Sequence, residues 1–142
     1  MSKNAHITEE TISKITTGLA QVSPLFNELI PSFTTRYIDK LNRALEQANA
    51  KDNAVSKMSA LYYFINKERP FPSGNKRIAL ALLLHSLAQE GKWLKATPEE
   101  LYEFAHWVSM APVDAKEEVI AYIEKFIRKH EVRMDRSMGN KQ

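Results

Sequence analysis

An apolar run from Ile78 to Leu84 follows directly on a turn that is rich in proline and glycine. A helix that is apolar on nearly all sides has to be covered on several sides by other elements. We therefore expect a helix from Ile78 to Gln89 at the centre of the fold. The chain has only four glycines and no long stretch that alternates apolar and polar residues. The sequence thus predicts an all-α helical bundle.

Capping residues and apolar spacing predict where the other helices begin. The strongest signal is the capping box from Thr97 to Glu100, which has a proline at the first helical position. The helix that follows carries Leu101, Phe104 and Val108 at core spacing. The expected helix starts are Thr8, Leu25, Thr34, Asn53, Thr97 and Val113. We expect Tyr62, Tyr63 and Trp93 to be packing residues.

The length of 142 residues is typical of one domain. We expect residues 1–136 to form it and residues 137–142 to be a short tail. The chain contains no cysteine, which excludes disulfides, thiol catalysis and cysteine-based metal sites. The four histidines, His6, His85, His106 and His130, are too scattered to predict a zinc cluster.

The net charge of +3 is only mildly basic, and the chain has no long basic block. Nucleic acid is therefore not an expected partner. No apolar run is long enough to span a membrane, and the N-terminus from Met1 to His6 lacks the apolar core of a signal peptide. We expect a cytoplasmic protein that does not insert into membranes.

Residues 69–77, called here the motif loop, carry the most specific chemical signal. The loop places Gly74, Asn75, Lys76 and Arg77 at the start of a helix, where backbone N–H groups and the helix dipole attract anions. Lys76 and Arg77 are unfavourable with that dipole unless an anion compensates them. The predicted ligand is a phosphate group. A simpler alternative is helix capping alone, with Gly74 in the turn, Asn75 as N-cap and two exposed cations.

The motif loop resembles the signature of the Fic/Doc family, His-x-Phe-x-Asp/Glu-Gly-Asn-Gly/Lys-Arg. Phe71, Gly74, Asn75, Lys76 and Arg77 stand at the matching positions. The lysine that follows the asparagine is similar to the Doc (death-on-curing) branch. The likeness extends over the flanking helices, from residue 58 to residue 101. In the first fifty residues we find no resemblance.

Two positions depart from the signature: its histidine is Arg69 here, and its acidic residue is Ser73. In the family, the histidine takes the proton from the target hydroxyl, and the acid holds the magnesium ion that bridges the nucleotide phosphates. A guanidinium cannot accept a proton, and a lone hydroxyl is a poor magnesium ligand. We therefore assign no catalytic residue and no metal site, and the change at Ser73 argues against magnesium.

Three other side chains are candidates for a replacement base. Glu68 adjoins the motif loop, but it stands one residue before the position of the lost histidine. On a helix end, that displacement turns the side chain by about a quarter turn, so Glu68 need not reach the histidine position. His85 lies two helical turns beyond Arg77, and His106 falls among apolar residues that predict a core or half-buried position. For Arg69 itself, the alternative to a ligand role is a drifted residue that pairs with Glu68 or with solvent.

The resemblance implies a fold, a ligand and a partner. The Doc branch comprises toxins that transfer the terminal phosphate of ATP to a protein hydroxyl and are neutralised by a disordered antitoxin segment. For this chain it implies a degenerate member that keeps a site for ATP or another nucleotide, formed by residues 74–77 together with Arg69. If active, it would be a phosphoryl or nucleotidyl transferase acting on protein hydroxyls, with an antitoxin-like or other protein as its partner. The alternative is a non-enzymatic interaction module that uses the fold as a scaffold.

One element of the family is not expected here. Fic and Doc proteins carry a short β-hairpin flap before the motif, but the matching segment from Leu45 to Ala54 contains no glycine and is rich in alanine, asparagine and lysine. We expect a helix end and a loop in its place. The inhibitory Ser-x-x-x-Glu-Gly/Asn motif of some Fic proteins is also not found.

Overall fold

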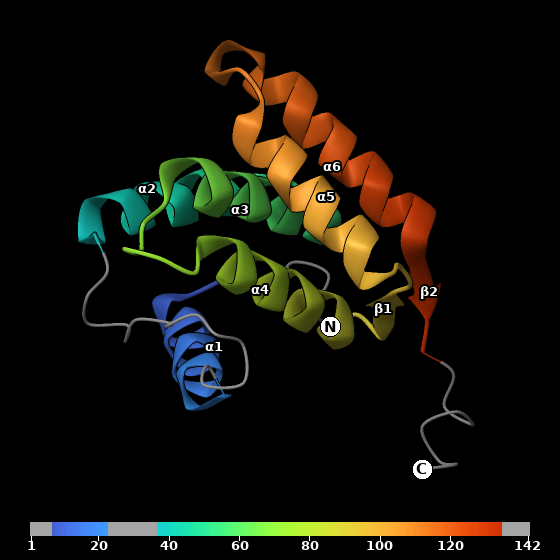
Figure 1. Cartoon of the computed structure of the whole chain (residues 1–142), viewed down its shortest axis with the longest axis horizontal. Coiled ribbons are helices and arrows are strands. Elements are labelled where there is room, and N and C mark those ends of the chain that lie inside the picture. The colour runs from blue at the N-terminus through green and yellow to red at the C-terminus, as the bar shows by residue number, and fades with distance from the viewer. Residues whose placement is uncertain (1–6, 23–36, 135–142) are drawn as a thin grey trace.

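The computed structural model describes residues 7–22 and 37–134, which form six α-helices, one 3₁₀ turn and two short strands (Figure 1). In chain order, the elements are α1 (Glu9–Val22), α2 (Ile38–Asn49), α3 (Ala54–Glu68), α4 (Asn75–Gln89), β1 (Lys92–Leu94), α5 (Pro98–Met110), η3 (Val113–Ala115), α6 (Lys116–His130) and β2 (Glu131–Arg133). The fold class is all-α, as the sequence predicts. The proposed tail, residues 137–142, lies outside the described residues.

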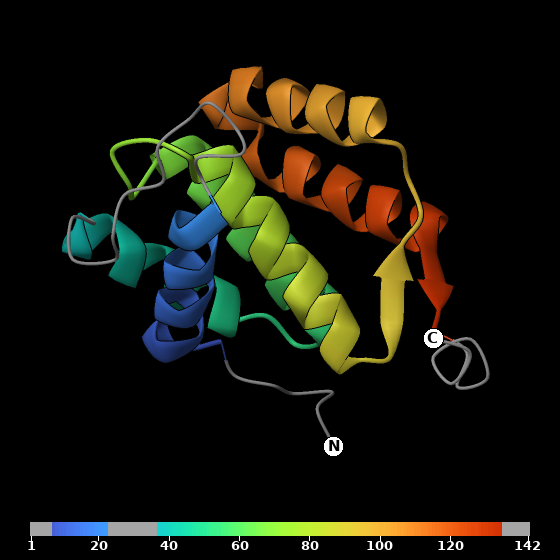
Figure 2. The same cartoon turned by 60° about the horizontal axis from the view of Figure 1, so that its bottom comes forward.

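Two helices form the interior of the molecule. The helix that follows the motif loop, α4, lies between α1 and α3 (Figures 1 and 2). Its inward side chains, among them Ile78, Leu82 and Leu87, are buried. Helix α3 packs against α2, α4, α5 and α6, and its side chains are buried from Lys57 to Asn66. The expected interior helix is therefore present, and α3 shares the centre with it.

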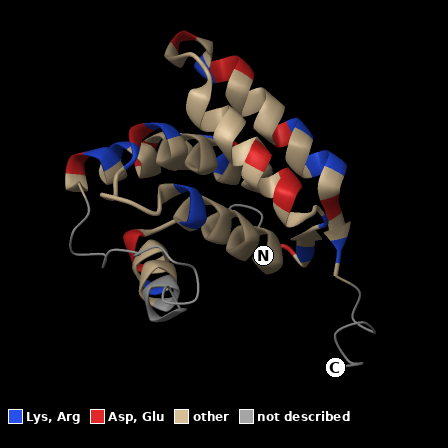
Figure 3. Cartoon of the chain, viewed as in Figure 1, with Lys and Arg blue, Asp and Glu red and all other residues tan. Residues whose placement is uncertain are grey.

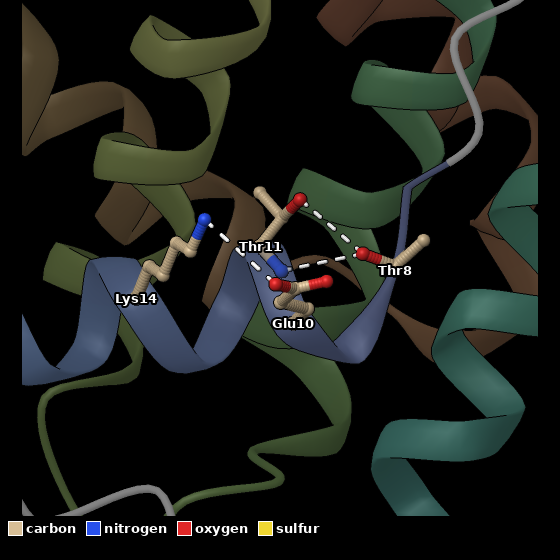
Figure 4. A network of polar contacts seen from close by, with 4 residues as sticks. All are labelled: Thr8, Glu10, Thr11 and Lys14. Carbon is tan, nitrogen blue, oxygen red and sulfur yellow. Dashed lines mark hydrogen bonds and ion pairs between the residues drawn. The ribbon is translucent and has the colours of Figure 1, made fainter.

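The predicted caps hold the helix starts. The Thr8 hydroxyl accepts a hydrogen bond from the Thr11 backbone N–H at 3.3 Å, and an ion pair of 3.8 Å joins Lys14 to Glu10 one turn later (Figure 4). Asn53 caps α3 through the Ser56 N–H at 2.9 Å. The capping box of α5 is complete. The expected starts at Leu25 and Thr34 lie outside the described residues.

A small sheet joins two distant parts of the chain, and the sequence did not predict it. Strands β1 and β2 pair antiparallel, with Trp93 opposite Val132. The Trp93 side chain is 45% exposed, so the expectation that Trp93 is a packing residue is wrong. The reason is that a strand places alternate side chains on opposite faces, and Trp93 points away from the face that buries Leu94.

The segment that would hold the family's flap is a helix end and a loop, as expected. Helix α2 ends at Asn49 and α3 begins at Ala54. The Lys57 ammonium group donates to the backbone carbonyls of Asn49 and Lys51, each at 3.0 Å, which closes the loop without a hairpin. In the described part of the chain, no helix combines the length and the apolar character that a membrane span requires.

Candidate functional site

The motif loop and the start of α4 enclose a cavity of about 380 Å³. Its lining comprises Arg69, Ser73, Gly74, Asn75, Lys76, Arg77 and Tyr102. The structure thus brings together all five predicted binding residues and both positions that depart from the family signature. Only Tyr102 comes from a distant part of the sequence.

Gly74 and Asn75 shape the entry to α4. Gly74 is the N-cap, in the left-handed region with φ 73°, which a glycine adopts without strain. Asn75 is therefore the first helical residue and not the N-cap that the helix-capping alternative supposes. Its side chain instead bonds back to Phe71, accepting from the backbone N–H at 3.1 Å and donating to the carbonyl at 2.8 Å. Asn75 thereby fixes the loop in its turn.

Three cations reach the cavity from two helix ends. Arg69 caps the C-terminus of α3 with φ 52°, and its side chain is exposed. Lys76 and Arg77 lie on the first turn of α4 and are half-buried, not exposed as the capping alternative supposed. Figure 3 shows this basic segment at the start of α4. Positive side chains are thus concentrated where the helix dipole is also positive.

The backbone at this helix start adds hydrogen-bond donors. The first intrahelical bond of α4 is the one from the Ile78 N–H to the Gly74 carbonyl, at 2.9 Å. The N–H groups that precede Ile78 in the helix have no acceptor within the helix, since helix geometry supplies none. Cationic side chains and such N–H groups together are the chemistry of an anion site.

No carboxylate lines the cavity. The nearest in sequence, Glu68, forms an ion pair with Arg43 of α2 at 3.4 Å. The ion pair of Glu68 is thus with Arg43, and Arg69 is an exposed residue of the cavity lining. The residues that line the cavity therefore include three cations and no acidic side chain.

His85 and His106, the two histidines that are candidates for a replacement base, lie outside this lining. His85 lines a separate small hollow between α1, α3 and α4. His106 is exposed and stacks on Tyr102, with ring centroids 6.4 Å apart. The expected core or half-buried position of His106 is therefore wrong, because it lies outside the apolar stripe of α5. Tyr62 and Tyr63 are buried packing residues, and burial raises the pKa of both phenols.

The residues present do not fit a magnesium site. Magnesium in proteins is held by oxygen ligands and usually by at least one carboxylate. The cavity lining has three cations and no carboxylate, and its side-chain oxygens are the hydroxyls of Ser73 and Tyr102 and the amide oxygen of Asn75. Within the described ranges there is no group of three or more acidic, histidine or cysteine residues that could hold a metal ion.

Tyr102 is the site residue that the sequence did not indicate. It is on α5, more than twenty residues after the motif loop, and its side chain is 65% exposed. The available signal was a large aromatic residue beside the core stripe of an amphipathic helix. The sequence shows that such a residue lies outside the core stripe. Only the fold shows which site the residue adjoins.

The family model described as Fic/DOC matches residues 6–87, which is more than half of the chain. The chain therefore belongs to the Fic/DOC family. The match begins near the N-terminus, so the expectation that the first fifty residues resemble nothing is wrong; it ends before α5. Searches among curated proteins and among solved structures found no match.

Proposed function

We propose that this chain is a catalytically degenerate Fic-fold protein, similar to the Doc branch, that retains a phosphate-binding anion site. The observation that carries the proposal is the composition of the cavity lining: Arg69, Lys76 and Arg77 surround the N-terminus of α4 with no carboxylate and no base among them. The lining can bind an anion, and it offers no group that takes a proton from a hydroxyl.

The replacement at Arg69 supports the loss of transfer chemistry. A general base must accept a proton, but a guanidinium stays protonated in proteins. Arg69 instead adds a charge-assisted hydrogen-bond donor suited to phosphate oxygens. With Ser73 in place of the acid, three cations substitute for the charge of the metal ion.

A nucleotide suits the cavity better than inorganic phosphate alone. The exposed ring of Tyr102 lines the cavity, and one of its faces stacks against His106. Bases stack readily on such aromatic rings, at about 1–3 kcal/mol each. We infer a nucleotide such as ATP, with its phosphates at the cations and its base near Tyr102. By its resemblance to the Doc branch, the protein would have an antitoxin-like partner.

An interaction module is the second candidate. The exposed Arg69 and the exposed pair of Tyr102 and His106 lie together at the cavity. Arginine and tyrosine are enriched at the energetic centres of protein interfaces. On this alternative, the cations contact acidic side chains of a partner.

Thermal unfolding with added ligand separates the two candidates. A ligand that binds only the folded state raises the melting temperature by mass action. We expect inorganic phosphate, ADP, ATP or GTP to raise it, and Lys76→Ala to reduce the rise. Lys14→Ala, which removes an exposed cation of α1, is the matched control and should keep the full rise. No rise with any of these ligands would favour the interaction module.

Transfer activity is tested separately with radiolabelled ATP and a bacterial lysate. We expect no labelled protein target. Robust labelling that is lost in Lys76→Ala would contradict the degenerate assignment, while leaving the anion site itself in place.

A further inference from the structure

The outer surface of α5 and α6 carries an apolar groove that the proposed function does not use. Three of its large side chains are well exposed: Trp107 by 45%, Tyr122 by 50% and Met110 by 70%. Two hollows, of about 450 and 760 Å³, run along the groove and share Trp107 and Tyr122. Exposed aromatic residues that line a continuous groove are typical of an interaction surface.

Aromatic contacts between the two helices form the floor of this groove. Phe104 stacks on Phe126 with ring centroids 3.9 Å apart, and Trp107 lies 4.9 Å from Tyr122. Both pairs join α5 to α6. Because these rings hold each other in place, the surface is preorganised, and little side-chain freedom is lost when it is covered.

Where α5 starts and α6 ends, the two rims of the groove have opposite charge, whereas the far end of the α6 rim carries Glu118. On α5 the rim carries Glu100 and Glu103, and on α6 it carries Lys125 and Lys129. The helices are antiparallel neighbours joined by η3, so the start of α5 lies beside the end of α6 (Figures 1 and 2). Figure 3 shows acidic segments on α5 next to basic segments on α6 at this end.

We propose that this groove binds a second copy of the chain, related by a two-fold axis that runs along the groove. Rotation about that axis places α5 of the second copy over α6 of the first. Glu103 of each copy then faces Lys125 and Lys129 of the other, and the helices that meet run antiparallel. The apolar rings of the two copies pack against one another at the centre, as in an isologous four-helix interface.

Charge complementarity favours a second copy over another partner. The two-fold rotation places the acidic α5 rim of each copy opposite the basic α6 rim of the other, so both rims find opposite charges at once. A uniformly acidic partner would suit only the α6 rim, and a uniformly basic one only the α5 rim. Like charges placed together across an interface disfavour binding, so either of these partners would meet repulsion along half of the groove.

Complementary charge reversals test the arrangement. Glu103→Lys removes the net negative charge of the α5 rim and places a cation opposite Lys125 and Lys129, and Lys125→Glu with Lys129→Glu makes both rims acidic. We expect sedimentation equilibrium to show a dimer for the wild type, and each reversed chain alone to dissociate with a dimer dissociation constant raised by about tenfold or more. An equimolar mixture of the two reversed chains should recover the dimer, because residue 103 of each chain then faces opposite charges at positions 125 and 129 of the other. Lys14→Glu on α1 is the matched control and should leave the dimer intact.

Met110→Glu provides an independent test of the apolar seam, since this exposed residue has little part in the core and its change should still dissociate the dimer. Circular dichroism establishes that each variant remains folded. The proposal is overturned if the wild type is a monomer at all concentrations from micromolar to millimolar. It is equally overturned if the reversed chains fail to recover a dimer when mixed.

Discussion

At the scale of single residues, the motif loop depends on two positions whose roles are visible only in the fold. Asn75 is 4% exposed and bonds both polar groups of its side chain to the backbone of Phe71. Gly74 turns the chain so that this contact forms. The asparagine of the family signature therefore has a structural role here, which is to hold the motif loop in its turn, whatever ligand the loop binds.

Replacing Asn75 tests that role. Asn75→Ala leaves the buried N–H and carbonyl of Phe71 without these partners, at an expected cost of about 1–3 kcal/mol in the free energy of unfolding. Asn53→Ala, which removes an exposed cap with one hydrogen bond, should cost about 1 kcal/mol. Urea denaturation of both variants compares them. A smaller loss for Asn75→Ala than for Asn53→Ala would contradict the account of the loop.

Arg69 combines backbone strain with a role in the cavity. Its φ of 52° lies in the left-handed region, where a residue with a Cβ atom costs about 1–2 kcal/mol relative to glycine. We expect the free energy of unfolding of Arg69→Gly to exceed that of Arg69→Ala by about 1 kcal/mol. The difference is smaller than the full strain because glycine also raises the entropy of the unfolded chain. Both variants should lose phosphate affinity, because both remove the same cation. Urea denaturation should therefore distinguish the two variants, whereas titration with phosphate should show the same loss of affinity for both. Equal stabilities of the two variants would show that the strain is absent.

At the scale of elements, the helices begin where local sequence chemistry is strongest. The capping box of α5 joins the Thr97 N–H to the Glu100 carboxylate at 2.8 Å and the Glu100 N–H to the Thr97 hydroxyl at 3.0 Å. The hydrogen bond from the Thr97 backbone lowers the pKa of the Glu100 carboxyl below its ordinary value. The ionised carboxylate therefore stabilises the folded state.

This pKa shift predicts a pH dependence of stability. Because the folded-state pKa of Glu100 is lowered, its contribution is present above the ordinary carboxyl pKa and is lost as the pH falls through the lower, folded-state value. Glu100→Gln keeps the side-chain length but does not titrate. We expect the stability difference between wild type and Glu100→Gln to shrink as the solution becomes acidic. Glu99→Gln removes a carboxylate from the same turn without the capping bond and serves as the control; thermal melts across the acidic range measure both.

The helices were largely predictable, and the sheet was not, for a physical reason. Caps such as Asn53 and Thr97 act within a single turn, so the local sequence contains the signal. Strands β1 and β2 have three residues each and are almost forty residues apart, and their pairing depends on how α5 and α6 bring them together. For the site, the motif identified its cations from the sequence. Tyr102 needed the packing of α5, and the role of Asn75 needed the backbone turn at Gly74.

At the scale of the whole molecule, the family match and the candidate site do not cover the same part of the chain. The match covers residues 6–87, which includes the motif loop and α4. Helices α5 and α6 lie beyond it, yet α5 supplies Tyr102 to the cavity, and both helices form the proposed dimer surface. The part of the chain outside the family match thus completes the proposed anion site and carries the second proposed interaction.

The central claim is that three cations bind phosphate without a metal ion. Calorimetric titration of ATP, with magnesium or with EDTA, tests it on the wild type and on the variant that carries Arg69→His with Ser73→Asp. The account predicts that wild-type binding persists in EDTA and weakens as salt screens the charges. It also predicts that binding by the double variant requires magnesium. Wild-type binding that disappears in EDTA, or no binding under either condition, would contradict the account.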